Sequence, residues 1–337
     1  MPELRQNPAT KEWVIIATER AKRPEDFCRS NNLPPLPEHD PGCPFCEGNE
    51  STTPPEILAY RNFGTCPNTP GWWIRIVPNK FAALVPEGNL RRIKSEEFFR
   101  YMDGVGEHEV LIEDPKHNAT FHNMNQKQIE EIFLAYRERY LALREDPRYE
   151  MIIIFKNHGF NAGTSLIHTH SQLVATPVTP SHIRHRLEEA MRYFDDNGEC
   201  VYCVEAKKEQ KVQERIVFET DNFLSFIPFA ASSPFEIMVL PKEHVSSFES
   251  SPAGKIKELA YVMKQVMMRI HVGLTHPDYN YMIFSSPCHE KDVEYYHWHL
   301  KIVPRVASVA GFEMGSGIYI NTVIPEKAAQ FLRNVKF

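Results

Sequence analysis

Two histidines stand one residue apart in the segment NHGFNAGTSLIHTHSQLVATP, residues 157–177, which follows the apolar run MIIIF and one lysine. Alternate side chains of a β-strand point to the same face, so His168 and His170 are expected to project together. Two imidazoles on one face suggest a metal-binding pair, a nucleophile with a helper, or a coincidence of composition. The choice depends on which other metal ligands the chain offers.

The cysteines supply such ligands. Seven are present, and four of them form two CxxC pairs, Cys43 with Cys46 and Cys200 with Cys203. The N-terminus is polar and lacks a signal-peptide core, so we expect a cytoplasmic protein with reduced thiols, in which metal binding is favoured over disulfides. No apolar run approaches the length of a membrane span, so none is expected. The net charge of −6 argues against nucleic-acid binding by bulk electrostatics but is compatible with a small anionic ligand.

The two halves of the chain repeat one pattern. EVLIEDPKHNATF aligns without a gap with EIMVLPKEHVSSF, which matches His117 with His244. IHTHSQLVATP parallels YHWHLKIVPRV, which matches His168 with His297, and one CxxC pair opens each half. Self-similarity of this kind indicates two copies of one structural unit.

Zinc prefers a tetrahedral set of sulfur and nitrogen ligands. The repeat predicts two such sets, and because four protein ligands close the coordination shell, both sites are expected to be structural. The first set is Cys43, Cys46, His117 and His168, and the second is Cys200, Cys203, His244 and His297. His299 could replace or join His297. Two alternatives remain open: one zinc ribbon built from the four paired cysteines, or small core cysteines with no metal.

The elements that must position these residues follow from hydrophobic periodicity. Residues 125–146 and 253–274 carry apolar residues at helical spacing, and each lies between strand-like runs. The order in each half is strands, a long helix, a strand and a strand. This order predicts an α+β fold with two tandem units, residues 1–180 and 181–337, each a mostly antiparallel sheet flanked by helices.

If a metal holds His168, the second imidazole of the HxH segment is free for chemistry. A neutral His170 can attack a phosphorus or acyl centre and form a covalent intermediate. Two glycines nearby permit close backbone approach, and no acidic residue interrupts residues 157–177, which suits an anionic ligand. The neutral hydrogen-bonding residues of the segment are Asn157, Ser165 and Gln172. The alternative is that His170 is only an inward-facing neighbour of a metal ligand.

These features resemble the galactose-1-phosphate uridylyltransferase branch of the histidine triad superfamily. The resemblance extends through nearly the whole chain, from NPATKEWVIIATERAKRPEDF through CPFCEGNE, RIVPNKFAAL, GVGEHEVLIEDPKH, NAGTSLIHTHSQ and HWHLKIVP to GFEMGSGIYINTVIPEKAAQFLR. It implies that His170 takes the uridylyl group from UDP-glucose and passes it to galactose 1-phosphate. It also implies a homodimer. The two ligand sets predict about two zinc ions per chain, with iron possible at the second site, and the charge and hydropathy predict no nucleic-acid or membrane partner. The substrate contacts that it implies are Asn157, Ser165, Gln172, Arg23, Arg75 and Glu313.

The chain departs from the familiar family pattern at two places. It has HTHSQ where HPHGQ is usual, so Thr169 and Ser171 replace proline and glycine. Near Glu313 the expected basic residue is missing and Ser308 stands in that neighbourhood. This tail resembles a subgroup that includes plant ADP-glucose phosphorylase, which suggests adenylyl transfer to phosphate as an alternative. A non-catalytic zinc-stabilised binding protein is the other alternative.

Overall fold

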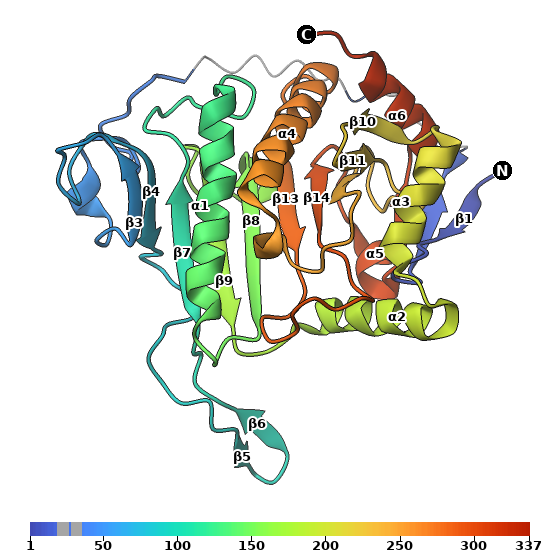
Figure 1. The fold of residues 1–337 in the computed structure, drawn as a ribbon, viewed down its shortest axis with the longest axis horizontal. Coiled ribbons are helices and arrows are strands. Elements are labelled where there is room, and N and C mark those ends of the chain that lie inside the picture. Colours follow the sequence, from blue (N-terminus) through green and yellow to red (C-terminus); the bar gives the residue numbers. More distant parts are fainter. Residues whose placement is uncertain (19–26, 28–35) are drawn as a thin grey trace.

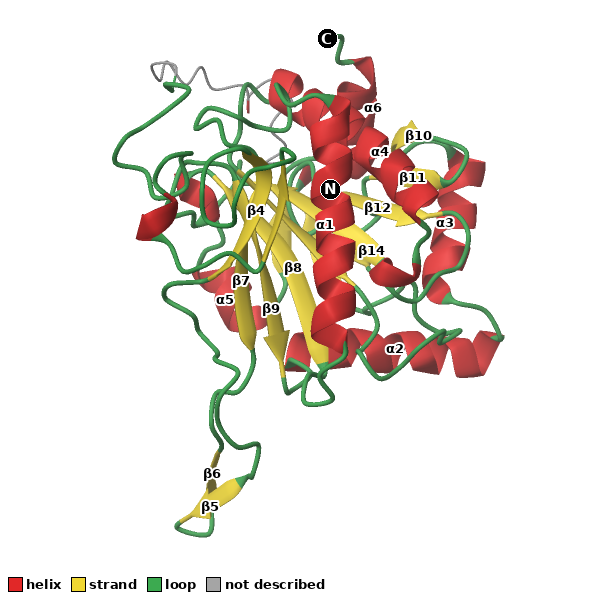
Figure 2. Cartoon of the chain, turned by 60° about the vertical axis from the view of Figure 1, so that its left-hand side comes forward, coloured by secondary structure: helices red, strands yellow, loops and turns green. Residues whose placement is uncertain are grey.

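The computed structural model spans residues 1–337 and describes residues 1–18, 27 and 36–337. Its centre is a ten-stranded sheet (Figures 1 and 2). In order across the sheet the strands are β3 (Leu58–Arg61), β4 (Trp72–Pro78), β7 (Glu107–Ile112), β9 (His170–Thr176), β8 (Met151–His158), β13 (Tyr279–Phe284), β14 (His299–Pro304), β12 (Ile237–Pro241), β11 (Phe223–Phe226) and β10 (Ile216–Glu219).

The sheet is symmetric in its strand order. Counting outward from the junction of β8 and β13, β9, β7, β4 and β3 on one side correspond to β14, β12, β11 and β10 on the other. The two halves join through antiparallel pairing of β8 with β13, in which Asn157 is opposite Asn280. Every neighbouring pair in this sheet is antiparallel. The predicted α+β class and the repeat are therefore confirmed, and the two copies share one continuous sheet; the boundary at residue 180 stays a prediction.

Two long helices cover one face of the sheet. Helix α1 (Gln126–Arg144) and helix α4 (Ala253–Gly273) confirm the two helices that the periodicity of residues 125–146 and 253–274 predicts. They lie side by side (Figure 1). Their apolar stripes, including Ile129, Phe133 and Leu259, are fully buried in the largest hydrophobic core. Burial of such side chains contributes roughly 1.5–3 kcal/mol each. This packing leaves the opposite face of the sheet for polar residues and ligands.

The remaining elements surround this body. A small sheet joins β1 (Glu3–Gln6), β2 (Trp13–Ile16) and β15 (Tyr319–Asn321), and the hairpin of β5 (Ile93–Ser95) and β6 (Phe99–Tyr101) projects away from the main sheet (Figures 1 and 2). The shorter helices are α2 (Ser181–Asn197), α3 (Val201–Val212), α5 (Gly311–Ser316) and α6 (Pro325–Asn334). Within the described ranges, no helix has the length and apolar character needed to cross a membrane.

Candidate active site and metal centres

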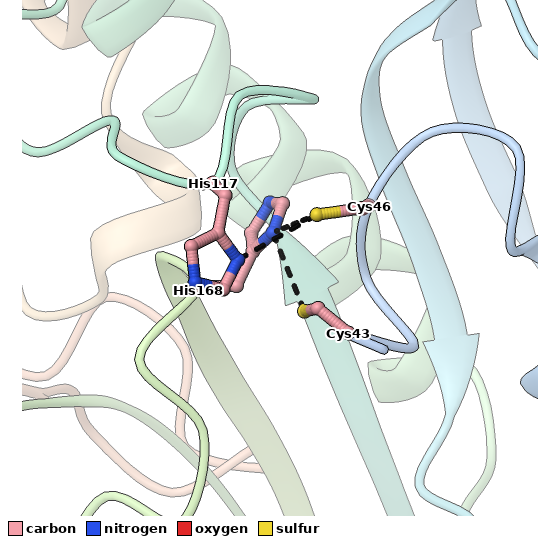
Figure 3. A group of neighbouring side chains, drawn as sticks. All are labelled: Cys43, Cys46, His117 and His168. Atoms are coloured by element: carbon pink, nitrogen blue, oxygen red, sulfur yellow. Dashed lines mark hydrogen bonds between the residues drawn. The ribbon is translucent and has the colours of Figure 1, made fainter. Parts of the chain in front are cut away.

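The first predicted ligand set comes together at the end of β9. Cys43 and Cys46, in a turn before β3, meet His117 from the segment after β7 and His168 from the segment before β9 (Figure 3). All four residues are buried, and their ligand atoms lie within 4.8 Å of one another. The Cys46 Sγ atom lies 3.5 Å from His117 Nδ1 and 3.6 Å from His168 Nδ1, and Cys43 Sγ lies 3.7 Å from His168 Nδ1.

These distances fit a tetrahedral cation. With metal–sulfur and metal–nitrogen bonds of about 2.3 and 2.1 Å, tetrahedral geometry places sulfur and nitrogen about 3.6 Å apart. The second ring nitrogen of His168 donates to the backbone carbonyl of Asp114 at 2.7 Å, which leaves Nδ1 as the lone-pair nitrogen. Burial raises the pKa of the Cys43 thiol to about 11, and a bound cation would offset that cost by binding the thiolate. The residues of this cluster therefore fit a metal ion.

The second predicted set also assembles, at the corresponding place in the repeat. Cys200, Cys203, His244 and His297 form the other described group able to hold a metal ion. Cys203 Sγ lies 3.3 Å from Nδ1 of both histidines. Hydrogen bonds from Cys203, and then from His244 and His297, lower the pKa of the Cys200 thiol, which favours a thiolate. His299 is not part of this group.

The imidazole of His170 is held in one orientation. Its Nδ1 donates to the carbonyl oxygen of His168 at 2.8 Å, so the lone pair is on Nε2. The ring packs edge-on against Phe45, with a centroid distance of 5.3 Å, and keeps only 7% of its surface exposed. Burial lowers the pKa of His170, which favours the neutral ring. This arrangement presents one basic nitrogen that can act as a nucleophile.

A glycine-dependent loop lies beside His170. Gly159 has a φ of +86°, and a Cβ atom there would lie 1.7 Å from Oδ1 of Asp278. Asp278 Oδ2 in turn accepts from the backbone and side-chain nitrogens of Asn161, both at 2.7 Å. The paired part of β8 and β9 ends with Phe155 opposite Gln172. Asn157 lies two residues further along β8, and its Oδ1 accepts from Asn280 at 2.8 Å. Ser165 is exposed in the same loop.

Gln172 is positioned by a residue that sequence reasoning missed. His108, on β7, lies 2.7 Å from the Gln172 side-chain oxygen through its Nε2. Because the backbone N–H of Ala83 donates to Nδ1 of His108 at 3.2 Å, Nε2 carries the proton and donates to Gln172. The side-chain nitrogen of Asn79 also lies 3.0 Å from Nε2. The amide nitrogen of Gln172 is then the end left to donate to a ligand. Alternation along GEHEVLI places His108 on the same face as Val110 and could have drawn attention to it.

The other predicted substrate contacts are not grouped with His170. Arg75 aligns with Ile112 and His170 across β4, β7 and β9, but it is 1% exposed. Its guanidinium is engaged by Glu56 at 3.1 Å, Thr53 at 2.8 Å and Asn68 at 3.2 Å. Its role as a phosphate contact stays a prediction, and it would require these bonds to be exchanged. Arg23 lies outside the described residues.

Glu313 lines a separate cavity of about 440 Å³. Met282 and Lys301 also line it, so it lies on the same face of the sheet as His170, over β13 and β14. The Glu313 carboxylate accepts from the backbone N–H of Ala310 at 3.1 Å. Ser308 lies in the wall of this cavity, and Arg305 provides a cation there. The role of Glu313 in sugar binding stays a prediction.

With this geometry in place, comparison with known proteins is informative. The family described as galactose-1-phosphate uridyl transferase matches through its N-terminal domain at residues 1–180 and its C-terminal domain at residues 186–336. ADP-glucose phosphorylase of Arabidopsis thaliana is 37% identical over 99% of this chain and 93% of its own length. Galactose-1-phosphate uridylyltransferase of Thermotoga maritima is 30% identical over 100% of this chain and 99% of its own.

A solved structure of a relative supports the same family and fold. The crystal structure of the Arabidopsis ADP-glucose phosphorylase with bound ADP-glucose superposes with a TM-score of 0.83, at 35% identity over 100% of both chains. The family match and the shared fold place the chain in a class of nucleotidyltransferases. The chain belongs to the galactose-1-phosphate uridyl transferase family and is a nucleotidyltransferase of that family.

Proposed function

We propose that this enzyme transfers a nucleoside monophosphate from a nucleotide sugar through a covalent intermediate on His170. The observation that carries the proposal is the ring of His170: Nδ1 is committed to the carbonyl of His168 at 2.8 Å, which leaves Nε2 as an available base beside a metal-ligand cluster. A histidine in this state forms covalent phosphoryl intermediates.

The reaction has two displacements. Nε2 of His170 attacks the α-phosphorus, a nitrogen–phosphorus bond forms, and the bond to the bridging oxygen breaks, so hexose 1-phosphate leaves with that electron pair. An acceptor phosphate oxygen then attacks the same phosphorus and the nitrogen–phosphorus bond breaks. Gln172, with its amide nitrogen free, and Ser165 would donate to the non-bridging oxygens as charge builds on them. Asn157 and the Gly159 loop would hold the group in line for both steps.

Two observations favour adenylyl transfer, with ADP-glucose as donor and phosphate as acceptor. The Arabidopsis ADP-glucose phosphorylase shares 37% identity with this chain, against 30% for the Thermotoga uridylyltransferase. The tail also has Ser308 where the family pattern carries a basic residue near Glu313. The second candidate, transfer of UMP from UDP-glucose to galactose 1-phosphate, is supported by the family as a whole.

Intact-mass analysis tests both candidates. The protein is incubated separately with ADP-glucose and UDP-glucose, without acceptor, and examined for an acid-labile nucleotidyl adduct. We expect the adduct with wild type and none with His170→Gln, and the nucleotide that loads faster identifies the donor. His299→Gln, at the matching place in the repeat, is the control and should load normally once a melting curve shows that it folds. An adduct on His170→Gln would refute the proposal.

We propose that both Cys/His clusters bind zinc as structural ions, with iron as the other candidate at the second. The clusters supply four protein ligands each, so they leave no position for an activated water. Elemental analysis of the purified protein should give about two metal ions per chain. We also propose a homodimer, as the family resemblance implies, which light scattering after size exclusion would test.

A further inference from the structure

A closed polar group lies behind His170, on the face of the sheet that otherwise packs against α1. Its members, Glu113, Lys156 and Thr169, are each 2% exposed or less. Their neighbours on this face, such as Leu111 and Leu173, belong to the hydrophobic core. We call these three residues the lysine clamp. An ion pair in such a place has a large desolvation cost, so good geometry and further hydrogen bonds must compensate it.

The ammonium group of Lys156 uses all three of its donors at the end of β7 and the start of β9. It donates to the Glu113 carboxylate, to Thr169 Oγ1 at 2.8 Å and to the backbone carbonyl oxygen of His170 at 3.2 Å. Thr169 Oγ1 donates in turn to the Glu113 carboxylate. The three members of the clamp are therefore bonded to one another. Outside the clamp, Glu113 also accepts from the Tyr136 hydroxyl at 3.3 Å, and Lys156 donates to the main chain of His170.

The backbone carbonyls of the HxH segment are divided among three partners. The carbonyl of Thr169 accepts from the backbone N–H of Glu113 at 3.2 Å, and the carbonyl of His170 accepts from Lys156. The carbonyl of His168 is left for Nδ1 of His170. The carbonyls of Thr169 and His170 are thus held by hydrogen bonds to Glu113 and Lys156. These bonds fix the direction of the neighbouring His168 carbonyl, and that carbonyl orients the His170 ring.

The clamp also accounts for one departure from the familiar family pattern. Proline at position 169 would have no hydroxyl, so Lys156 and Glu113 would each lose a hydrogen-bond partner. In this chain the hydroxyl of Thr169 bonds to both. Ser171, on the other side of His170, also contacts the clamp: its Oγ accepts from Tyr136 at 2.7 Å, and both Ser171 and Tyr136 donate to Glu113.

We propose that Lys156, paired with Glu113 and joined to Thr169, is a positioning residue for the His170 imidazole. This inference rests on the proposed role of His170 as nucleophile. The clamp does not touch the substrate; it sets the main-chain geometry that keeps Nδ1 bonded to the carbonyl of His168 and Nε2 directed at phosphorus. Ring misplacement by about 1 Å is enough to slow such a step about 100-fold.

A pair of threonine variants tests the inference with little change in shape. Thr169→Val keeps the side-chain volume and removes the hydroxyl, whereas Thr169→Ser keeps the hydroxyl. We expect Thr169→Val to lower the rate of adduct formation roughly 10- to 100-fold, with the affinity for the nucleotide sugar changed less than about threefold. Thr169→Ser should recover most of the rate. Ser225→Ala, equally buried but in the second half of the chain, where its hydroxyl donates to the carbonyl of Phe218, should load within about threefold of wild type.

A spectroscopic readout separates positioning from general stability. In protein labelled with nitrogen-15 at histidine, His170 should show a single tautomer with the proton on Nδ1 in wild type and in Thr169→Ser. Thr169→Val, and the doubly neutral Lys156→Met with Glu113→Gln, should show exchange between tautomers while metal content is retained.

The inference is overturned if Thr169→Val loads as fast as wild type, or if Thr169→Ser fails to recover the rate. A fixed tautomer in both clamp variants would also overturn it. The tautomer of His170 is observable without substrate, so positioning can still be tested if no nucleotide sugar forms an adduct. The absence of any adduct would refute the proposed function but not the positioning role.

Discussion

A cluster of three histidines between the halves predicts a loss of stability in mild acid. The ring of His271, in the last turn of α4, stacks on His122 with centroids 3.7 Å apart, and His271 Nδ1 lies 3.2 Å from His276 Nδ1. Burial, together with His122, His276 and His158, lowers the pKa of His271 to about 3, and Lys264 also faces His122. The native protein therefore resists protonation at this site.

The sign follows from linkage. The unfolded chain has a histidine pKa of about 6.5, so it binds a proton below that pH while the native ring does not. The contribution of the neutral His271 ring to the free energy of unfolding is complete above pH 6.5 and is lost as the pH falls toward 3. At pH 5 this contribution has fallen by at most about 2 kcal/mol, and because the ring is partly exposed we expect a fall of about 1 kcal/mol.

Urea unfolding at pH 7.5 and 5.0 measures this difference. Between pH 7.5 and pH 5.0, the free energy of unfolding should fall by about 1 kcal/mol more in wild type than in His271→Phe. The reason is that phenylalanine keeps the stacked ring but binds no proton. Other groups titrate in both proteins, so their contribution cancels in the comparison. His289→Gln, at an exposed histidine, is the control and should behave as wild type. Equal losses in wild type and His271→Phe would refute the reasoning.

Three further predictions follow from the site. Cys43→Ser should lower the metal content from about two ions per chain to about one and lower the melting temperature, whereas Cys66→Ser, at an exposed cysteine outside both clusters, should change neither. Gly159→Ala should reduce nucleotide loading because its Cβ would collide with a carboxylate 1.7 Å away, and Gly163→Ala, which has φ +85° but open space, should reduce it less. His108→Phe should slow loading about tenfold through a misplaced glutamine while the unfolding free energy changes little; loading at the wild-type rate would contradict that role.

The sequence was sufficient for the fold class and for the ligand clusters because both depend on the repeat. A CxxC pair, a lone histidine and an HxH segment in each half determine the ligand sets, and helical periodicity determines α1 and α4. The same pattern gives no information on Lys156 or Thr169, whose partners lie on other strands. Register decides which side chains meet, and a shift of one residue would turn Lys156 toward the opposite face. For the same reason the ion pair that engages Arg75 could not be expected, because Glu56 and Arg75 meet only through the pairing of β3 with β4.

The two halves keep the same HxH segment but use it differently. His299 repeats the hydrogen bond of His170, since its Nδ1 donates to the carbonyl of His297 at 3.1 Å. However, the ring of His299 lies between Tyr202 and Phe284, stacked on both at centroid distances of 4.8 and 5.1 Å, and is fully buried. Its Nε2 is buried and has no hydrogen-bond partner among the described residues, so a ligand would have to move neighbouring side chains to reach it. His170 instead has a single edge-on aromatic neighbour, a glycine-dependent loop beside it and the lysine clamp behind it. The duplication has therefore preserved the ligand cluster in both copies, and only the first copy leaves its second imidazole accessible for chemistry.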